Sequence, residues 1–173
     1  GYWADIGTIR SFYDTNLDLT LPKAKFDLFD PGNPIYTHAR YLPGSRVVNS
    51  RLENVLLAEG GCITDSEIIH SVVGLRSKIE PGCKIEDTIL MGSDYYTDQE
   101  NLHEIPIGIG KNCRITGAII DKNARVGSDV VIEPFPMGTD LDERYWVVRD
   151  GIVVIPKNAQ IASGTRIAPR SLE

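Results

Sequence analysis

Two lysines are the residues whose type and setting point most directly to binding chemistry. Lys122 lies in IIDKNARVG and Lys157 in VVIPKNAQI, and each follows a polar or turn residue outside the aliphatic positions of its segment. Two ammonium groups that converge from adjacent coils of a solenoid can neutralise the carboxylate and the phosphate of one small anion. A single lysine on such a face is ordinarily solvated, so the alternatives are a charged surface and an anion site. Arg125 and Arg149 would add positive charge to an anion site.

One aspartate, Asp5 in YWADIGT, is a candidate metal ligand. Mg²⁺ at phosphoryl-transfer sites takes one or two carboxylates together with phosphate oxygens. An aspartate near a glycine is more often a turn or cap residue, however. The residues alone therefore favour the structural role for Asp5.

The elements that must position these residues are indicated by aliphatic side chains that recur, with one exception, every five or six residues within each stretch. They fall in three stretches: Ile63, Ile68, Val73, Ile79, Ile85 and Met91; Ile109, Ile115, Ile120, Val126 and Ile132; Ile152, Ile155, Ile161 and Ile167. Neither the period of a strand nor that of an α-helix gives this spacing, but a short-repeat parallel β-helix does. We therefore predict a mainly β protein in which about eighteen residues make one triangular coil. Cys83 and Cys113 fall where a tight corner favours a small or thiol side chain.

Two polar segments, residues 93–106 and 133–150, interrupt this rhythm, and we expect both to be excursions between coils. Upstream of the repeats, Thr8 is expected to cap a short helix whose apolar positions are Ile9, Phe12, Tyr13 and Leu17. Prolines and a glycine prevent any long regular element in residues 21–44, which we predict to be a linker.

Composition limits the classes of function. The 173 residues suit one domain, or one domain with fragments of another, and 42% hydrophobic residues are enough for a core. A net charge of −6 with interspersed signs disfavours nucleic-acid binding, and no apolar run approaches the roughly 18 residues of a membrane span. The three cysteines, Cys62, Cys83 and Cys113, are expected to be buried thiols in a reducing compartment.

Seven segments occur in one order along the chain. They are GYWADIGTIRSFYDTNL, PIYTHARYLPGS, SVVGLRSKI, MGSDYY, PIGIGKNCRI, IIDKNARVG and DGIVVIPKNAQI. Together they closely resemble glucose-1-phosphate adenylyltransferase (ADP-glucose pyrophosphorylase), in particular its cyanobacterial and plant type, over nearly the whole chain. Hexapeptide repeats alone would be weak support, because many sugar-nucleotide and acyl-transfer enzymes carry them, but the combination is highly specific.

The resemblance implies a two-domain subunit. A doubly wound α/β domain would bind ATP and glucose 1-phosphate, and a left-handed β-helix would serve regulation and assembly of a homotetramer. The left hand comes from the resemblance, since ordinary crossover chirality favours the right. Residues 1–20 would then be the end of the catalytic domain, 21–44 the linker and 45–170 the β-helix. Residues 171–173 are expected to be a remnant foreign to the natural sequence.

The resemblance also assigns roles to particular residues. Lys122 and Lys157 match two lysines implicated in binding the activator, 3-phosphoglycerate in the plant and cyanobacterial type, with fructose 1,6-bisphosphate or phosphate as other candidate effectors. Arg40 lies in a matching motif of the linker, and Asp5 matches the aspartate expected to help hold Mg²⁺ in the full enzyme. The glycine-rich phosphate-binding loop has no counterpart in this chain, so we expect no turnover and no bound cofactor for the chain alone. The parent enzyme would make ADP-glucose for glycogen or starch, in a bacterial cytoplasm or a plastid.

Two rival functions stay open. A stand-alone hexapeptide-repeat acyltransferase would use a histidine as general base; His70 and His103 are the candidates, and His103 lies in the first polar segment. A purely structural assembly module would bind no ligand at all. A zinc site built from His38, His70 and His103 is disfavoured by the long separations between them.

Overall fold

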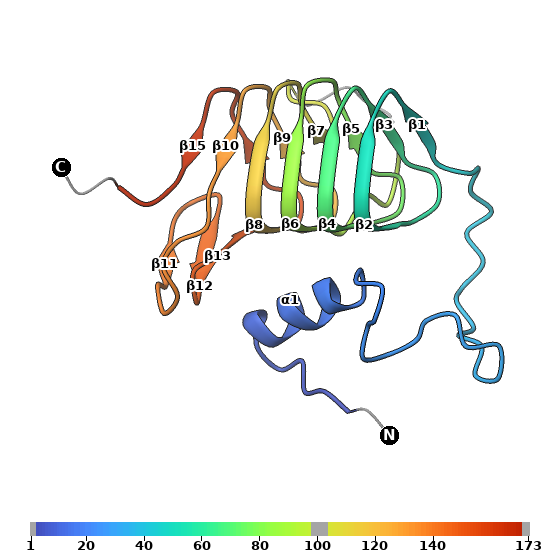
Figure 1. Ribbon diagram of the computed structural model, residues 1–173. Helices are drawn as coiled ribbons and strands as arrows, with labels where there is room; N and C mark the ends of the chain where they lie inside the picture. The colour runs from blue at the N-terminus through green and yellow to red at the C-terminus, as the bar shows by residue number, and fades with distance from the viewer. Residues whose placement is uncertain (1–2, 98–103, 171–173) are drawn as a thin grey trace.

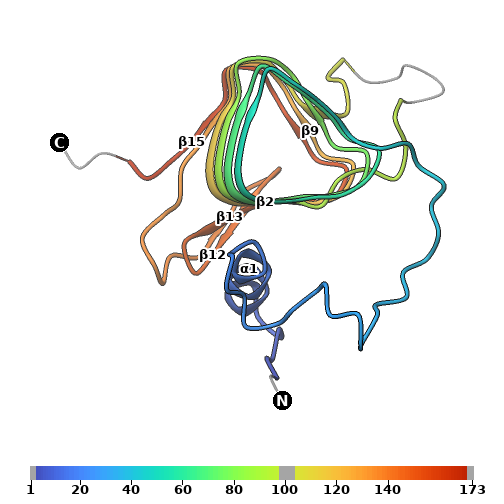
Figure 2. The ribbon, with the colours of Figure 1, turned by 45° about the vertical axis from the view of Figure 1, so that its right-hand side comes forward.

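The computed structural model describes residues 3–97 and 104–170. Its strands pair in parallel with their equivalents one coil later, and the coils stack into a three-sided β-helix that is seen nearly end-on in Figure 2. One sheet contains β1 (Arg46–Val48), β3 (Cys62–Thr64), β5 (Lys78–Ile79), β7 (Gly108–Ile109), β9 (Arg125–Val126) and β14 (Gln160–Ile161). The prediction of a mainly β protein with parallel coils is confirmed.

A second, longer sheet covers the other two sides. Its parallel strands are β2 (Arg51–Leu57), β4 (Glu67–Val73), β6 (Lys84–Leu90), β8 (Arg114–Ile120), β10 (Val131–Ile132), β13 (Ile152–Ile155) and β15 (Arg166–Ile167). The strands β2, β4, β6 and β8 each have seven residues and bend round one corner of the triangle. Where no excursion intervenes, equivalent residues lie 16 or 17 apart, as in the hydrogen bonds from Ser66 N to Ser50 Oγ and from Thr88 N to Ser71 Oγ. The coil is thus slightly shorter than the eighteen residues expected.

The core is the aliphatic series that the rhythm indicated, with two corrections. Leu90, not Met91, follows Ile85 into the core, because the strand β6 turns its corner in five residues instead of six. In the last stretch Val153 and Ile155 point inward, whereas Ile152 lies on the outer face of the sheet. Alternation along a strand sends neighbouring residues to opposite faces, so an error of one residue reverses the side that each one faces.

Each corner is made by residues with positive φ, which stack from coil to coil. Along the bend of the long strands these are Asn54, His70, Asp87 and Gly117, with φ of 53°, 43°, 47° and 65°. Asn and Asp tolerate this left-handed conformation better than other side chains with a Cβ. The thiols do not make the corners: Cys83 and Cys113 are buried and unpaired, and Gly82 and Asn112 before them carry the positive φ. Cys62 is only partly buried.

The helix α1 (Ile9–Asp18) is capped by the side chain of the preceding Thr8, as predicted. It lies against the outer face of the longer sheet (Figure 1), where Tyr13 and Leu17 pack on Ile89, Ile119 and Ile152. From Leu19 to Asn33 the backbone forms turns and bends, and residues 34–45 have no regular structure before β1 begins. No helix within the described residues is long and apolar enough to cross a membrane.

The second excursion forms a hairpin instead of an irregular loop. Its strands β11 (Leu141–Asp142) and β12 (Val147–Arg149) pair antiparallel, and β12 continues antiparallel onto β13. Trp146 stacks on Phe135 with 6.2 Å between ring centroids, and both pack against the core. The first excursion leaves the β-helix after β6 and returns at β7, and its residues 98–103 lie outside the described part.

Candidate functional site

Lys122 and Lys157 come together on one carboxylate. Lys122 Nζ lies 2.9 Å from Asp94 Oδ1, and Lys157 Nζ lies 3.5 Å from Asp94 Oδ2. Each ammonium thus contacts a different oxygen of the same group. The two ammonium groups thus meet at one corner of the β-helix, which we call the lysine corner (Asp94, Lys122, Asn123 and Lys157).

Parallel pairing explains why two lysines 35 positions apart meet. The strands β8 and β13 pair in register, with Ile120 opposite Ile155, and each lysine lies two residues beyond its strand's last residue. Asn123 and Asn158, the next residues, turn the chain with φ of 60° and 61°. Asn158 N donates to Lys122 O at 3.0 Å, which fixes the two rungs together. Neighbouring parallel strands lie about 4.8 Å apart, so the lysines extend from the corner side by side.

Asp94 is held by the buried Asn123 as well as by the lysines. Its backbone N–H donates to Asn123 Oδ1 at 2.8 Å, and Asn123 Nδ2 donates to Asp94 Oδ2 at 3.1 Å. The hydrogen bond from the Lys122 ammonium, followed by that from Asn123, lowers the pKa of Asp94 from 3.8 to about 2. The three charged side chains remain between 35% and 53% exposed, so small solutes can reach them.

Sequence reasoning missed Asp94, although a signal was present. The strand β6 pairs with β8, with Leu90 opposite Ile120, so residues just after Leu90 reach the same corner as Lys122. Asp94 follows in the segment MGSDYY, where the chain leaves for the first excursion. Lys122 lies two residues beyond Ile120, whereas Asp94 lies four residues beyond Leu90, so a search several residues past the paired strand ends would have brought it to attention.

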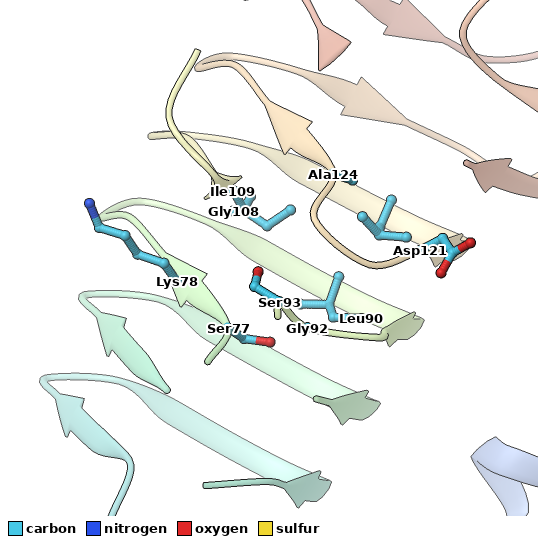
Figure 3. Close-up of a pocket in the computed structure, with 10 residues that line it drawn as sticks. Ser77, Lys78, Leu90, Gly92, Ser93, Gly108, Ile109, Asp121 and Ala124 are labelled. Atoms are coloured by element: carbon cyan, nitrogen blue, oxygen red, sulfur yellow. The ribbon is translucent and has the colours of Figure 1, made fainter. Parts of the chain in front are cut away.

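Two cavities lie near the first excursion, and neither fits the role better than the lysine corner. The one in Figure 3, beside Gly92, Ser93 and Asp121, measures about 20 Å³, which is room for about one water molecule. A second, of about 420 Å³, is lined by Lys78, Glu80, Lys111 and residues 104–107 among others. Lys78 and Glu80 form an ion pair of 2.8 Å there, so the cavity does not concentrate positive charge.

The arginines proposed for the anion site have other contacts. Arg125 is buried, and its guanidinium donates to the carbonyl of Ile105 at 2.9 Å, at the return of the first excursion. Arg149 forms an ion pair of 2.5 Å with Asp142 in the hairpin. It pairs with Ile152 at the start of β13, whereas Lys157 follows the end of that strand. Arg40 is exposed in the segment before β1.

Asp5 is exposed shortly before α1, and its Oδ1 accepts a hydrogen bond from Gly7 N at 2.9 Å. Within residues 3–97 and 104–170, no group of three His, Cys, Asp or Glu side chains is arranged to hold a metal ion. The donor set therefore fits Mg²⁺ only as a single carboxylate that other ligands would have to complete.

The histidines are dispersed. His70 forms part of a corner, where its Nδ1 lies 2.5 Å from Asp87 Oδ1 and its Nε2 is buried without a hydrogen bond. His38 is exposed before β1, and His103 lies outside the described residues. The described part of the chain thus gives His70 a structural contact at the corner beneath α1, and the acyltransferase alternative rests on His103 alone.

Comparison with known proteins adds two findings. Residues 40–166 match the family model described as the GLGC left-handed parallel β-helix domain, which confirms the left hand. The chain is 39% identical over 175 aligned residues to a protein of Zea mays named glucose-1-phosphate adenylyltransferase large subunit 1, chloroplastic/amyloplastic. That alignment covers 96% of this chain and 34% of the maize protein, so the chain spans about a third of this relative's length.

Proposed function

The chain belongs to the family of the GLGC left-handed parallel β-helix domain, and we propose that it is the regulatory and assembly part of a glucose-1-phosphate adenylyltransferase. The parent enzyme would convert ATP and glucose 1-phosphate to ADP-glucose and pyrophosphate. The 39% identity to the maize protein along 96% of this chain supports the proposal. The substrates would bind to the catalytic domain, of which residues 1–20 are the end.

In the parent reaction a phosphate oxygen of glucose 1-phosphate attacks the α-phosphorus of ATP, and pyrophosphate leaves. Mg²⁺ would supply charge neutralisation at the phosphate oxygens. Asp5 would contribute one carboxylate to its coordination, consistent with the exposed position of Asp5 and its single backbone hydrogen bond among the described residues. The chain alone would not turn over substrate.

The chain's own task would be to sense an anionic metabolite at the lysine corner. The observation that carries this proposal is the convergence of Lys122 and Lys157 on the two oxygens of one carboxylate. A corner that accommodates the Asp94 carboxylate in this way has the charge and spacing to bind a carboxylate or phosphate from solution. 3-Phosphoglycerate carries both groups, and fructose 1,6-bisphosphate and inorganic phosphate carry the latter.

A route from the lysine corner toward the catalytic domain is built into the same strands. The strands β6, β8 and β13, which lead into Asp94, Lys122 and Lys157, carry Ile89, Ile119 and Ile152 on their outer faces. These three side chains form the surface on which α1 packs, and α1 begins four residues after Asp5. Anion binding that shifts these strand ends would change the population of α1 positions, and with it the competence of the catalytic domain.

Assembly into a homotetramer would cover apolar surface that this chain leaves exposed. Trp3, Phe29, Tyr36 and Tyr41 are at least 80% exposed, all of them before the first strand. Such side chains are typical of surfaces that contact another domain or subunit.

The maize relative's name places that protein in chloroplasts or amyloplasts. For this chain we propose a plastid or a bacterial cytoplasm, with glycogen or starch as the end product.

The proposal is tested with a longer protein that joins this chain to its catalytic domain. We expect it to release pyrophosphate from ATP and glucose 1-phosphate, with a rate that 3-phosphoglycerate increases. Lys157→Ala should raise the activator concentration for half-maximal stimulation. Acetyl transfer from a CoA thioester, lost on His103→Ala, would instead establish the acyltransferase alternative.

A further inference from the structure

We propose that Asp94 is an internal competitor for the anion site: its carboxylate occupies the place of the effector's anionic group and must move aside before an effector binds. The inference rests on the proposed function of Lys122 and Lys157 and adds to it a determinant of affinity. Asp94 reaches both lysines at once, at 2.9 Å and 3.5 Å, so a soluble anion cannot bridge the same two ammonium groups while Asp94 remains between them.

The side chain of Asp94 can leave while the backbone stays. Residue 94 is anchored through its own N–H to Asn123 Oδ1, and the preceding Ser93 N donates to Leu75 O at 2.7 Å. Arg76 donates to the carbonyl of Ser93 at 3.2 Å from the next rung of the corner. These bonds hold Ser93 and the peptide group that joins it to Asp94. A rotation about the Cα–Cβ bond is then sufficient to remove the carboxylate from the lysines.

Exchange of one anion for another is feasible at this position. Asp94 and Lys122 are between one-third and one-half exposed and Lys157 is half-exposed, so the displaced carboxylate re-enters water without leaving a buried, unpaired charge. The tether also makes Asp94 an effective competitor, because a group held within reach acts at a high local concentration. The apparent affinity for a soluble anion equals the intrinsic affinity multiplied by the fraction of time for which the lysines are unoccupied by Asp94.

Asp94 would therefore set which anions bind. A weak monoanion cannot replace a carboxylate that already pairs with two ammonium groups. A ligand that brings a phosphate, or a phosphate and a carboxylate, supplies more charge than it displaces. Removal of the Asp94 charge should increase the affinity for every anion. The increase for inorganic phosphate should be at least as large as that for 3-phosphoglycerate.

The experiment is a calorimetric titration of the 173-residue chain with inorganic phosphate and with 3-phosphoglycerate at low ionic strength. Asp94→Asn keeps the shape of the side chain and its hydrogen bonds with Asn123 but removes the charge. Asp142→Asn is the matched control, because it removes an equal charge from a carboxylate that pairs with Arg149 instead. Circular dichroism on both variants verifies that the β-helix is intact.

We expect Asp94→Asn to lower the dissociation constants of both anions by on the order of tenfold, with Asp142→Asn within about twofold of the parent chain. Unchanged or weaker binding by Asp94→Asn, with binding still weakened by Lys122→Ala, would overturn the competitor role and leave the anion site standing. If no variant, Asp94→Asn included, bound either anion, the proposed function and this inference would both be overturned.

Discussion

The hydroxyl of Tyr13 donates a hydrogen bond of 2.5 Å to the backbone carbonyl of Asp87, 74 residues later in the chain. Asp87 is a corner residue of β6, with φ of 47°, so the bond joins the middle of α1 directly to the β-helix. Arg10 reinforces it one turn earlier, with its Nε 3.0 Å from Asp150 Oδ2 and a further bond to the Asp150 carbonyl. Two polar contacts and the apolar surface beneath Leu17 thus fix the helix.

Loss of the Tyr13 hydroxyl should destabilise the chain moderately. Tyr13→Phe retains the ring on Ile89 and Ile119 but leaves a partly buried carbonyl without its donor, which costs about 1–2 kcal/mol in the free energy of unfolding. Urea unfolding measures the change. Tyr36→Phe is the control, since that side chain is 92% exposed and its loss should cost less than about 0.5 kcal/mol. Equal effects at both positions would contradict the anchoring role.

Alkaline pH should weaken the same contact. Burial raises the pKa of Tyr13 well above its usual 10.0, and the nearby Asp87 and Asp14 carboxylates add to the increase while Arg10 opposes it. The folded state therefore favours the neutral phenol. This contribution is fully present below pH 10 and is lost as pH rises from there toward the folded pKa. The difference in unfolding free energy between the parent chain and Tyr13→Phe should shrink above pH 10. If the unfolding free energies of the two proteins changed in parallel with pH, the contribution of Tyr13 ionisation would be refuted.

The corner inside the long strands should reject a side chain at Gly117. This residue has φ of 65°, and a Cβ there would lie 2.7 Å from the Cβ of Pro134. Gly117→Ala should cost about 2–4 kcal/mol, because backbone strain and overlap add. Gly138→Ala separates the two causes: its φ is 82° but no atom lies within 4 Å of the added Cβ, so only the backbone cost of about 1–2 kcal/mol should appear. If denaturant unfolding showed similar losses of unfolding free energy for Gly117→Ala and Gly138→Ala, the role of the Pro134 contact would be contradicted.

Two neighbouring substitutions test the direction of side chains at the end of β6. Leu90 is 4% exposed within the core, so Leu90→Ala should cost about 2–5 kcal/mol. Met91 contacts the outer cluster under α1, and Met91→Ala should cost less while increasing hydrogen exchange in α1. If Met91→Ala were the more destabilising of the two, the inward position would belong to Met91.

Much of this arrangement follows from local sequence. Thr8 caps α1 through interactions within one turn, and the aliphatic rhythm defines the coils because each coil repeats the same inward positions. The error at Met91 arose because a bent strand takes five residues across its corner and a straight side takes six. Ile119 was equally hard to assign, since an outer residue that a helix covers has the same composition as an inner one.

The lysine corner was only half predictable. Lys122 and Lys157 could be paired because their segments are alike and one strand register separates them. Asp94 belongs to an excursion, and excursion length varies without regard to the repeat, so its position depends on how β6 and β8 align in three dimensions. A residue's place on the corner is thus a property of strand pairing, which five- or six-residue periodicity does not encode.

The central claim, that Lys122 and Lys157 form one anion site, is tested most directly by calorimetric titration of the chain with 3-phosphoglycerate. Each charge-assisted hydrogen bond contributes about 1.5–3 kcal/mol, so Lys122→Ala and Lys157→Ala should each weaken binding by on the order of 10- to 100-fold. Lys78→Ala, which breaks a comparable ion pair with Glu80, should leave the affinity unchanged. Binding that persists unaltered in both Lys122→Ala and Lys157→Ala would contradict the account.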